Sequence, residues 1–288
     1  RVERRRPLET RFRGRSLVSN PPPSAGGLLI AAALAALDEH PPPHTDAQYY
    51  RAVAWAGEVA NGMRDDAFFH DLHRDLPRDH WRALRRTAQA ALPETRKPAG
   101  STTHISVVDA AGAMVSLSSS NGAGSGVMVP GTGVLLNNML GEEDLNPDGF
   151  GTGRPGSRLT SMMAPTIVER DGVPAIAVGA AGSNRLRSAI TQTVVSLVDQ
   201  GLDAGAAVRR ARVHPEGGGL DVEGGISSDL CAELGRAGHA LRRWDGMNLF
   251  FGGVSVVARH GDELSGAGDP RRGGGAFGTT RSGEVVEL

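Results

Sequence analysis

The sequence predicts an α+β fold in which helices and sheets pack in layers. Three observations support this class. The periodicity of apolar residues changes from helical to two-residue alternation near residue 100, and turns separate the strands that follow. A helical region then lies between two groups of strands. Strands followed by helices and then by strands again indicate layered α+β packing rather than an alternating parallel sheet.

The first hundred residues read as mostly helical. Three helices are expected there, at Leu28–Leu37, Asp46–Met63 and about Asp79–Ala91. The apolar first helix should be buried and should stop before the prolines at 41–43, because proline cannot continue a helix. Trp55 and Phe68 are expected in the core.

After residue 100 the pattern is typical of strands. These are expected at His104–Asp109, Ala113–Ser118, Gly126–Leu136, Met163–Arg170, Ala175–Val178 and a closing pair within Phe250–Arg259. The first two should form a hairpin across a short turn ending at Gly112. Helices are expected at Arg187–Gln200, Ala204–Arg212 and Ser228–Ala237, the first ending at Gly201.

Composition excludes several classes of protein. The 31 basic and 32 acidic residues nearly cancel, so no nucleic-acid partner is expected. No run approaches the ~18 apolar residues of a membrane span. The single Cys231 excludes an internal disulfide framework and is expected to be buried. No His-rich spacing points to a metal, and no cofactor is expected.

The 40 glycines are concentrated after Thr102, which marks an organisational boundary near residue 100. The chain begins with Arg1 in a polar segment, so we expect a fragment or a processed product. The absence of a signal peptide is then uninformative, and the compartment stays open.

Thr102 stands at the head of the first strand after this boundary. If the chain were cut between Ser101 and Thr102, Thr102 would carry both a hydroxyl and a free α-amine. An α-amine has an ordinary pKa of about 7.7–8.0, so it can act as a general base near neutral pH. A Thr-Thr pair opening a strand is normally explained by β-propensity alone, so this hypothesis depends on the rest of the chain.

Six collinear elements resemble the γ-glutamyltransferase family of N-terminal nucleophile hydrolases. They are Phe12-Arg13-Gly14 with Asn20–Ser24, Thr102-Thr103-His104, Gly131–Met139, Ser161-Met162 with Pro165–Val168, Gly182–Arg185 and Asp269-Pro270-Arg271. The resemblance implies a stacked αββα fold and a precursor that cleaves itself before Thr102. It also implies γ-glutamyl transfer from glutathione-like donors to water, amino acids or peptides.

The resemblance also divides the chain. Residues 1–101 would be the C-terminal part of a large subunit and residues 102–288 the small catalytic subunit, the two forming a heterodimer from one precursor. In the family, an earlier part of the large subunit supplies an arginine that clamps the donor carboxylate, and that part is absent from this sequence.

The family's catalytic roles transfer to four residues. Thr102 corresponds to the nucleophile, and Ser120 to the hydroxyl that supports it, although counting back from Gly126 favours Ser118. Gly182 and Ser183 stand where the family has two glycines whose backbone N–H groups bind the oxyanion. His104 is expected to pack beneath the nucleophile.

The donor-binding roles transfer less directly. Asn121 corresponds to an asparagine that binds the donor carboxylate, displaced by one position, and Thr160 and Ser161 to a serine pair with the same task. Glu142 is the acid expected to hold the donor's α-ammonium, because a charge-assisted hydrogen bond is stronger than a neutral one. Adjacent hydroxyls at a strand start and an acidic surface loop are the simpler explanations of these features.

Two alternatives stay open. The departures at Glu142 and Ser183 allow a related N-terminal-Thr amidohydrolase with another donor, such as a cephalosporin-acylase-like or poly-γ-glutamate-processing enzyme. A non-catalytic, unprocessed homologue that serves as a scaffold or binding protein is the other. His214, followed by a proline, is expected to be structural.

Overall fold

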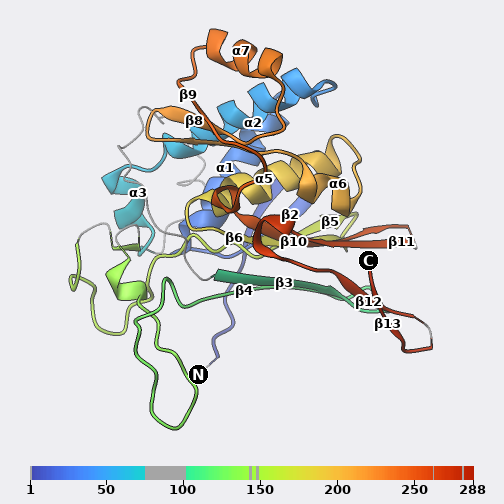
Figure 1. Cartoon of the computed structure of the whole chain (residues 1–288). Coiled ribbons are helices and arrows are strands. Elements are labelled where there is room, and N and C mark those ends of the chain that lie inside the picture. The colour runs from blue at the N-terminus through green and yellow to red at the C-terminus, as the bar shows by residue number, and fades with distance from the viewer. Residues whose placement is uncertain (1, 75–101, 143–144, 147–148, 262, 281) are drawn as a thin grey trace.

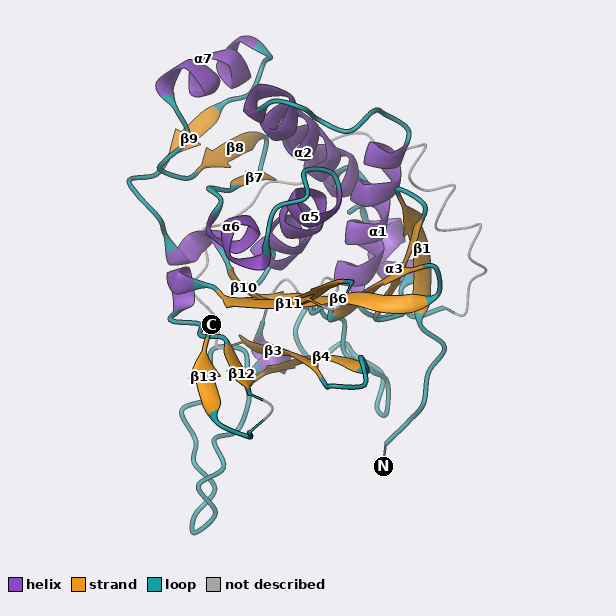
Figure 2. Ribbon diagram, turned by 90° about the vertical axis from the view of Figure 1, so that its right-hand side faces the viewer, coloured by secondary structure: helices purple, strands orange, loops and turns teal. Residues whose placement is uncertain are grey.

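The computed structural model describes residues 2–74, 102–142, 145–146, 149–261, 263–280 and 282–288. Their elements form layers: helices lie on one face of a central sheet, and a two-stranded hairpin lies on the other (Figures 1 and 2). The helix expected at 79–91 and the residue Ser101 fall outside the described residues.

The central sheet has six antiparallel strands. In spatial order they are β1 (Leu8–Phe12), β2 (Arg15–Ser19), β5 (Thr166–Arg170), β6 (Val173–Ala181), β10 (Gly253–His260) and β11 (Glu263–Gly268). The expectation of a mostly helical N-terminal segment is wrong for β1 and β2. Arg13 and Gly14 both have positive φ, 51° and 73°, and form the tight turn that lets these short strands pair.

Helices cover one face of this sheet. They are α1 (Ala25–Asp38), α2 (Asp46–Asn61), α3 (Asp66–Asp71), α5 (Arg185–Val198), α6 (Ala204–Arg209) and α7 (Ser228–Arg236). Each of the five expected helices among the described residues is present, with ends shifted by up to three residues. Phe68 is buried as expected, but Trp55 is 38% exposed and stacks edge-on with the His40 ring, so its core assignment is wrong.

The hairpin of β3 (Thr102–Val108) and β4 (Met114–Ser120) covers the opposite face, against β6 and β10. Its turn lies where the sequence predicts it, and Asp109 accepts the backbone N–H of Ala113. The strand β4 continues two residues beyond the expected end at Ser118. That extension brings Ser120 into register with Thr102.

The two faces of the hairpin differ in chemistry. Serines and His104 face the central sheet, whereas Ile105, Val107, Val115 and Leu117 face outward and are each about half exposed. The described residues thus supply three layers of the expected αββα arrangement, helices, sheet and hairpin, and no described helix covers this apolar outer face.

The segment Gly126–Leu136 is not a strand of any sheet, contrary to expectation. It folds back on itself as an extended ribbon, with one bridge between Met128 and Leu135 and a backbone hydrogen bond of 2.9 Å from Val129 N to Val134 O. The Pro130–Gly133 sequence reverses the chain in the middle of the segment, and the ribbon projects away from the body (Figure 1).

Smaller elements complete the fold. They are the 3-10 turns η1 (Met139–Gly141), η3 (Leu249–Phe251) and η4 (Pro270–Arg272), the sheet β7 (Val213–Glu216), β8 (Gly219–Val222), β9 (Leu241–Arg243), and the hairpin β12 (Phe277–Thr279), β13 (Val285–Glu287). The closing pair expected within Phe250–Arg259 is wrong in its bounds: only one strand, β10, falls there, starting at Gly253 after η3, and its partner β11 follows at Glu263–Gly268. Cys231 is buried, and none of the described helices is long and apolar enough to cross a bilayer.

Candidate active site

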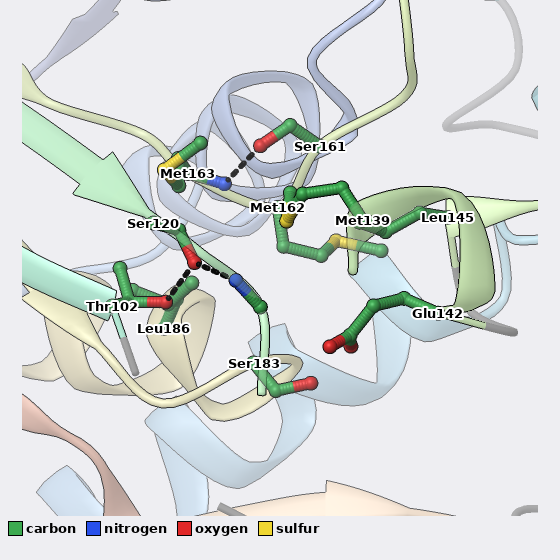
Figure 3. A pocket seen from close by; sticks show the side chains of 11 residues that line it. Thr102, Ser120, Met139, Glu142, Leu145, Ser161, Met162, Met163, Ser183 and Leu186 are labelled. Atoms are coloured by element: carbon green, nitrogen blue, oxygen red, sulfur yellow. Dashed lines mark hydrogen bonds between the residues drawn. The ribbon is translucent and has the colours of Figure 1, made fainter. Parts of the chain in front are cut away.

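A pocket opens at the end of the β3–β4 hairpin, where several distant segments meet (Figure 3). Its lining is Thr102, Ser120, Gly122, Met139, Glu142, Leu145, Ser161, Met162, Met163, Ser183 and Leu186. Five residues predicted from the sequence are therefore brought together: Thr102, Ser120, Glu142, Ser161 and Ser183. Asn121, Thr160 and Gly182 are not part of the lining.

Thr102 and Ser120 form the hydroxyl pair of the site. The antiparallel register places them opposite each other, and their Oγ atoms lie 3.1 Å apart. Ser118, the other serine that spacing allowed, lies opposite His104 instead. The Ser120 Oγ also accepts the Gly122 backbone N–H at 3.0 Å. This second bond fixes the Ser120 hydroxyl, which holds the Thr102 side chain in turn.

His104 lies beneath this pair, buried between the hairpin and the central sheet. Ser106 gives its only hydroxyl proton to the Ser255 carbonyl, so its Oγ accepts from His104 Nε2 at 3.0 Å. The Ser118 hydroxyl then donates to Nδ1 at 2.8 Å. This assigned arrangement suits a neutral imidazole, and burial lowers the pKa of His104 from 6.5 to about 4. The residue is packed, as expected, and does not line the pocket.

The buried neutral His104 predicts a pH-dependent stability. Above pH 6.5 the ring is neutral in both states, so its contribution is complete. Below that value the unfolded chain binds a proton that the folded chain rejects, so the free energy of unfolding falls until about pH 4. A shift of this size corresponds to up to about 3 kcal/mol.

Urea unfolding at pH 7 and pH 4 checks this expectation. The difference in unfolding free energy between wild type and His104→Gln should shrink by up to about 3 kcal/mol at the lower pH. Parallel pH curves for the two proteins would contradict a buried, neutral His104.

The Gly182-Ser183 loop joins β6 to α5 beside the pocket. Gly182 has φ +137°, and a Cβ there would lie 2.8 Å from the Gly252 Cα, so glycine is required. Ser183 has φ 53°, a left-handed conformation that costs a non-glycine residue roughly 1–3 kcal/mol and that is found at functional sites. Its side chain points into the pocket (Figure 3). The positive end of the α5 dipole follows directly and favours negative charge here.

The predicted donor-binding residues separate into two groups. Glu142 is partly buried with its carboxylate in the pocket, where Oε1 accepts the Ala123 N–H at 3.0 Å. Ser161 also lines the pocket. Thr160 is buried elsewhere, with its Oγ1 3.1 Å from His73 Nε2, and Asn121 is exposed. The geometry thus favours Ser161 over Thr160 as a pocket hydroxyl.

The apolar half of the pocket was missed by sequence reasoning. Met139, Met162 and Met163 line it with Leu145 and Leu186. The methionines lie inside or beside the sequence elements that carry the family resemblance. This position was the one signal in the sequence that they could belong to the site. Methionine is flexible and fills irregular space, so a motif gives no indication of which way it points.

A buried charge network lies behind the Gly182-Ser183 loop. Arg212 donates to Asp269 at 2.6 Å and to the Gly252 carbonyl at 3.1 Å, and Arg271 donates to Glu223 at 2.6 Å. All four charged side chains are at most 2% exposed. Because Gly252 packs on Gly182, this network supports the loop from behind. Within the described residues, no group of three or more His, Cys, Asp or Glu side chains is arranged to hold a metal.

Comparison with known proteins identifies the family. The model of the gamma-glutamyltranspeptidase family matches residues 1–279, nearly the whole chain. The chain belongs to the γ-glutamyltranspeptidase family. The glutathione hydrolase proenzyme of Bacillus subtilis (strain 168) is 31% identical over 187 residues, which are 63% of this chain and 31% of that protein. The chain therefore spans about a third of this relative's length.

Solved structures agree with membership of the γ-glutamyltranspeptidase family. The crystal structure of cephalosporin acylase from Bacillus halodurans superposes with a TM-score of 0.75 at 25% identity, covering 98% of this chain and 52% of that chain. Gamma-glutamyltranspeptidase from Pseudomonas nitroreducens, complexed with L-DON, gives a TM-score of 0.50 at 30% identity, covering 59% and 95%. The predicted α+β fold of N-terminal nucleophile hydrolases is confirmed.

Proposed function

We propose that this chain carries the catalytic centre of a γ-glutamyltransferase and glutathione hydrolase, with Thr102 as its N-terminal nucleophile. One observation carries the proposal: Thr102 is the first residue of β3, lines the pocket and lies 3.1 Å from the Ser120 hydroxyl. Residues 102–288 would be the small subunit and residues 1–101 the end of the large subunit, produced from one precursor by cleavage between Ser101 and Thr102.

The proposed reaction uses Thr102 twice. After cleavage, its α-amine takes the hydroxyl proton while Oγ1 attacks the γ-carbonyl carbon of the donor. The backbone N–H groups of Gly182 and Ser183 stabilise the oxyanion. The C–N bond then breaks, the leaving amine takes the proton, and a γ-glutamyl ester of Thr102 remains. Water or the amine of an amino acid or peptide attacks this ester, loses a proton to the α-amine, and releases Thr102.

Charge complementarity supports a γ-glutamyl donor. The Glu142 carboxylate in the pocket matches an α-ammonium, and Ser161 offers a hydroxyl to the donor's α-carboxylate. Asn121 would assist from outside the present lining. These contacts fit glutathione and similar small molecules, and no resident cofactor enters the reaction.

A cephalosporin-acylase-like activity is the second candidate, favoured by the 98% coverage of this chain in the acylase comparison. The two candidates differ in one charge, because a γ-glutamyl group carries an α-ammonium and a glutaryl group does not. A pocket selecting glutaryl donors gains nothing from the Glu142 carboxylate. The first candidate therefore fits the pocket better.

Replacing Glu142 by glutamine should separate these activities. We expect kcat/KM for γ-glutamyl-anilide to fall about 10- to 100-fold, as for loss of a charge-assisted hydrogen bond, with little change for glutaryl-anilide. Release of the aniline by the full-length protein measures both. Glu39→Gln, at an exposed carboxylate after α1, should leave both rates unchanged. Wild-type preference for glutaryl-anilide would overturn the γ-glutamyl assignment and support the acylase.

A further inference from the structure

The turn Asn121–Gly124 links the nucleophile pair to the rest of the pocket. It follows Ser120 directly, and Gly122 and Gly124 both take left-handed backbone angles, with φ of 62° and 81°. Within this turn, Gly122 N donates to the Ser120 hydroxyl that holds Thr102. A movement of this turn would therefore move the Ser120 hydroxyl.

Asn138, from the far end of the ribbon, holds this turn in shape. Its Oδ1 accepts the backbone N–H groups of Ala123 at 2.7 Å and Gly124 at 3.2 Å. Its own backbone N–H donates to the Asn121 carbonyl at 3.2 Å. One residue thus makes three hydrogen bonds to a four-residue turn.

The same turn also holds the acid of the pocket. Ala123 N–H is shared between Asn138 Oδ1 and Glu142 Oε1, the latter at 3.0 Å. A Cβ on Gly122 would lie 2.2 Å from Asn138 Oδ1 and 2.6 Å from Glu142 Oε1, so these groups pack in direct contact. Gly122 and Glu142 line the pocket, but Asn138 does not.

We propose that Asn138 is a positioning residue that sets the Ser120–Thr102 pair and Glu142 through one hydrogen-bonded turn. For its kinetic consequences the inference rests on the proposed function, because Thr102 is there the nucleophile and Glu142 the donor-binding acid. Asn138 itself would not touch the donor. It would act on Ser120, Thr102 and Glu142 through the backbone of residues 121–124. The essential group is the Oδ1 acceptor.

Three variants of the full-length protein test the acceptor. Asn138→Ala removes it, and we expect kcat for γ-glutamyl-anilide to fall about 100-fold, as for small misplacements of reacting groups, with a raised donor KM. Asn138→Asp keeps an oxygen that accepts both N–H bonds, so the turn should keep its shape, but it adds a negative charge beside Glu142, so amide exchange rather than kcat is its readout. Asn137→Ala is the matched control: its exposed side chain accepts the N–H of Met139 and makes no hydrogen bond to the 121–124 turn, so its kcat should stay within about threefold of wild type.

Amide hydrogen exchange provides a readout that needs no activity. Asn138→Ala should speed the exchange of the Ala123 and Gly124 amides at unchanged global stability, and Asn138→Asp should restore their protection. Equal kcat in Asn138→Ala and Asn137→Ala, or failure of Asn138→Asp to restore protection of the two amides, would overturn the inference. If wild type releases no aniline, the proposed function has failed. Unaltered amide exchange in Asn138→Ala would separately show that the turn does not depend on Asn138.

Discussion

Replacing Thr102 by alanine should leave the precursor uncut and reduce γ-glutamyl release by at least about 10⁴-fold, because removal of a covalent nucleophile typically costs 10⁴- to 10⁶-fold in kcat. Alanine lacks the Oγ1 that would attack the donor carbonyl in the proposed reaction. It also lacks the hydroxyl that would attack the preceding peptide bond. Both losses follow from one atom, which lies 3.1 Å from Ser120 Oγ at the pocket.

The neighbouring threonine is the matched control. Thr103 is exposed and follows Thr102 on the opposite face of β3, so Thr103→Ala should leave cleavage and kcat close to wild type. Thr102→Ser retains a hydroxyl and should cleave and turn over more slowly. A denaturing gel shows whether the precursor is cut, and mass spectrometry gives the mass of each fragment. Release of aniline measures the activity.

The outcomes distinguish the remaining interpretations. Two fragments meeting between residues 101 and 102 in wild type, and one intact chain in Thr102→Ala, support an N-terminal nucleophile. One intact, inactive chain in wild type would support the unprocessed binding homologue instead. Cleavage or activity that persists in Thr102→Ala would remove Thr102 from the mechanism altogether.

The sequence indicated the hairpin and the place of the proposed nucleophile because both signals are local. Alternation on either side of a short turn predicts β3 and β4, and a hydroxyl at the strand head follows from Thr102 alone. Choosing Ser120 over Ser118 requires the register, which the turn around Asp109 fixes. The strand β4 ends at Ser120, two residues beyond the predicted end at Ser118. Counting back from Gly126 does not reveal this end.

The rest of the site depends on contacts between distant segments. Thr160 and Ser161 are equivalent in sequence, yet Thr160 is buried against His73 whereas Ser161 lines the pocket. Residues 126–136 look like a strand by composition but meet no sheet, so they form a ribbon. The role proposed for Asn138 could not be foreseen, because its partners around Ala123 precede the ribbon whereas Asn138 follows it. In each case the conformation depends on a contact with a segment distant in sequence, which a local pattern does not reveal.

The Asp269-Pro270-Arg271 element was recognised from sequence, but its partners were not. Asp269 Oδ2 accepts Arg212 Nη2 at 2.6 Å and the Val254 N–H at 2.9 Å, while Oδ1 accepts the Arg271 N–H at 3.0 Å. Arg212 is fully buried, and burial lowers the pKa of its guanidinium while the Asp269 charge opposes that shift. Asp269 is thus the anion that makes a buried arginine tolerable.

Asp269→Asn should therefore be the most destabilising single change among these, by about 3–5 kcal/mol, because it leaves Arg212 buried with its nearest negative charge removed. Urea unfolding of the full-length protein measures this loss. The matched control is Glu233→Gln, which breaks an exposed ion pair with Arg51 of 3.4 Å and should cost less than about 1 kcal/mol.

A double-mutant cycle shows whether the charge pair itself is responsible. Arg212→Met combined with Asp269→Asn removes both members, so the double variant should be clearly more stable than the sum of the single losses predicts. Strict additivity, or a cost for Asp269→Asn no larger than for Glu233→Gln, would contradict the assignment. Because Arg212 also donates to the Gly252 carbonyl behind Gly182, Asp269→Asn should lower kcat as well in whatever fraction remains folded.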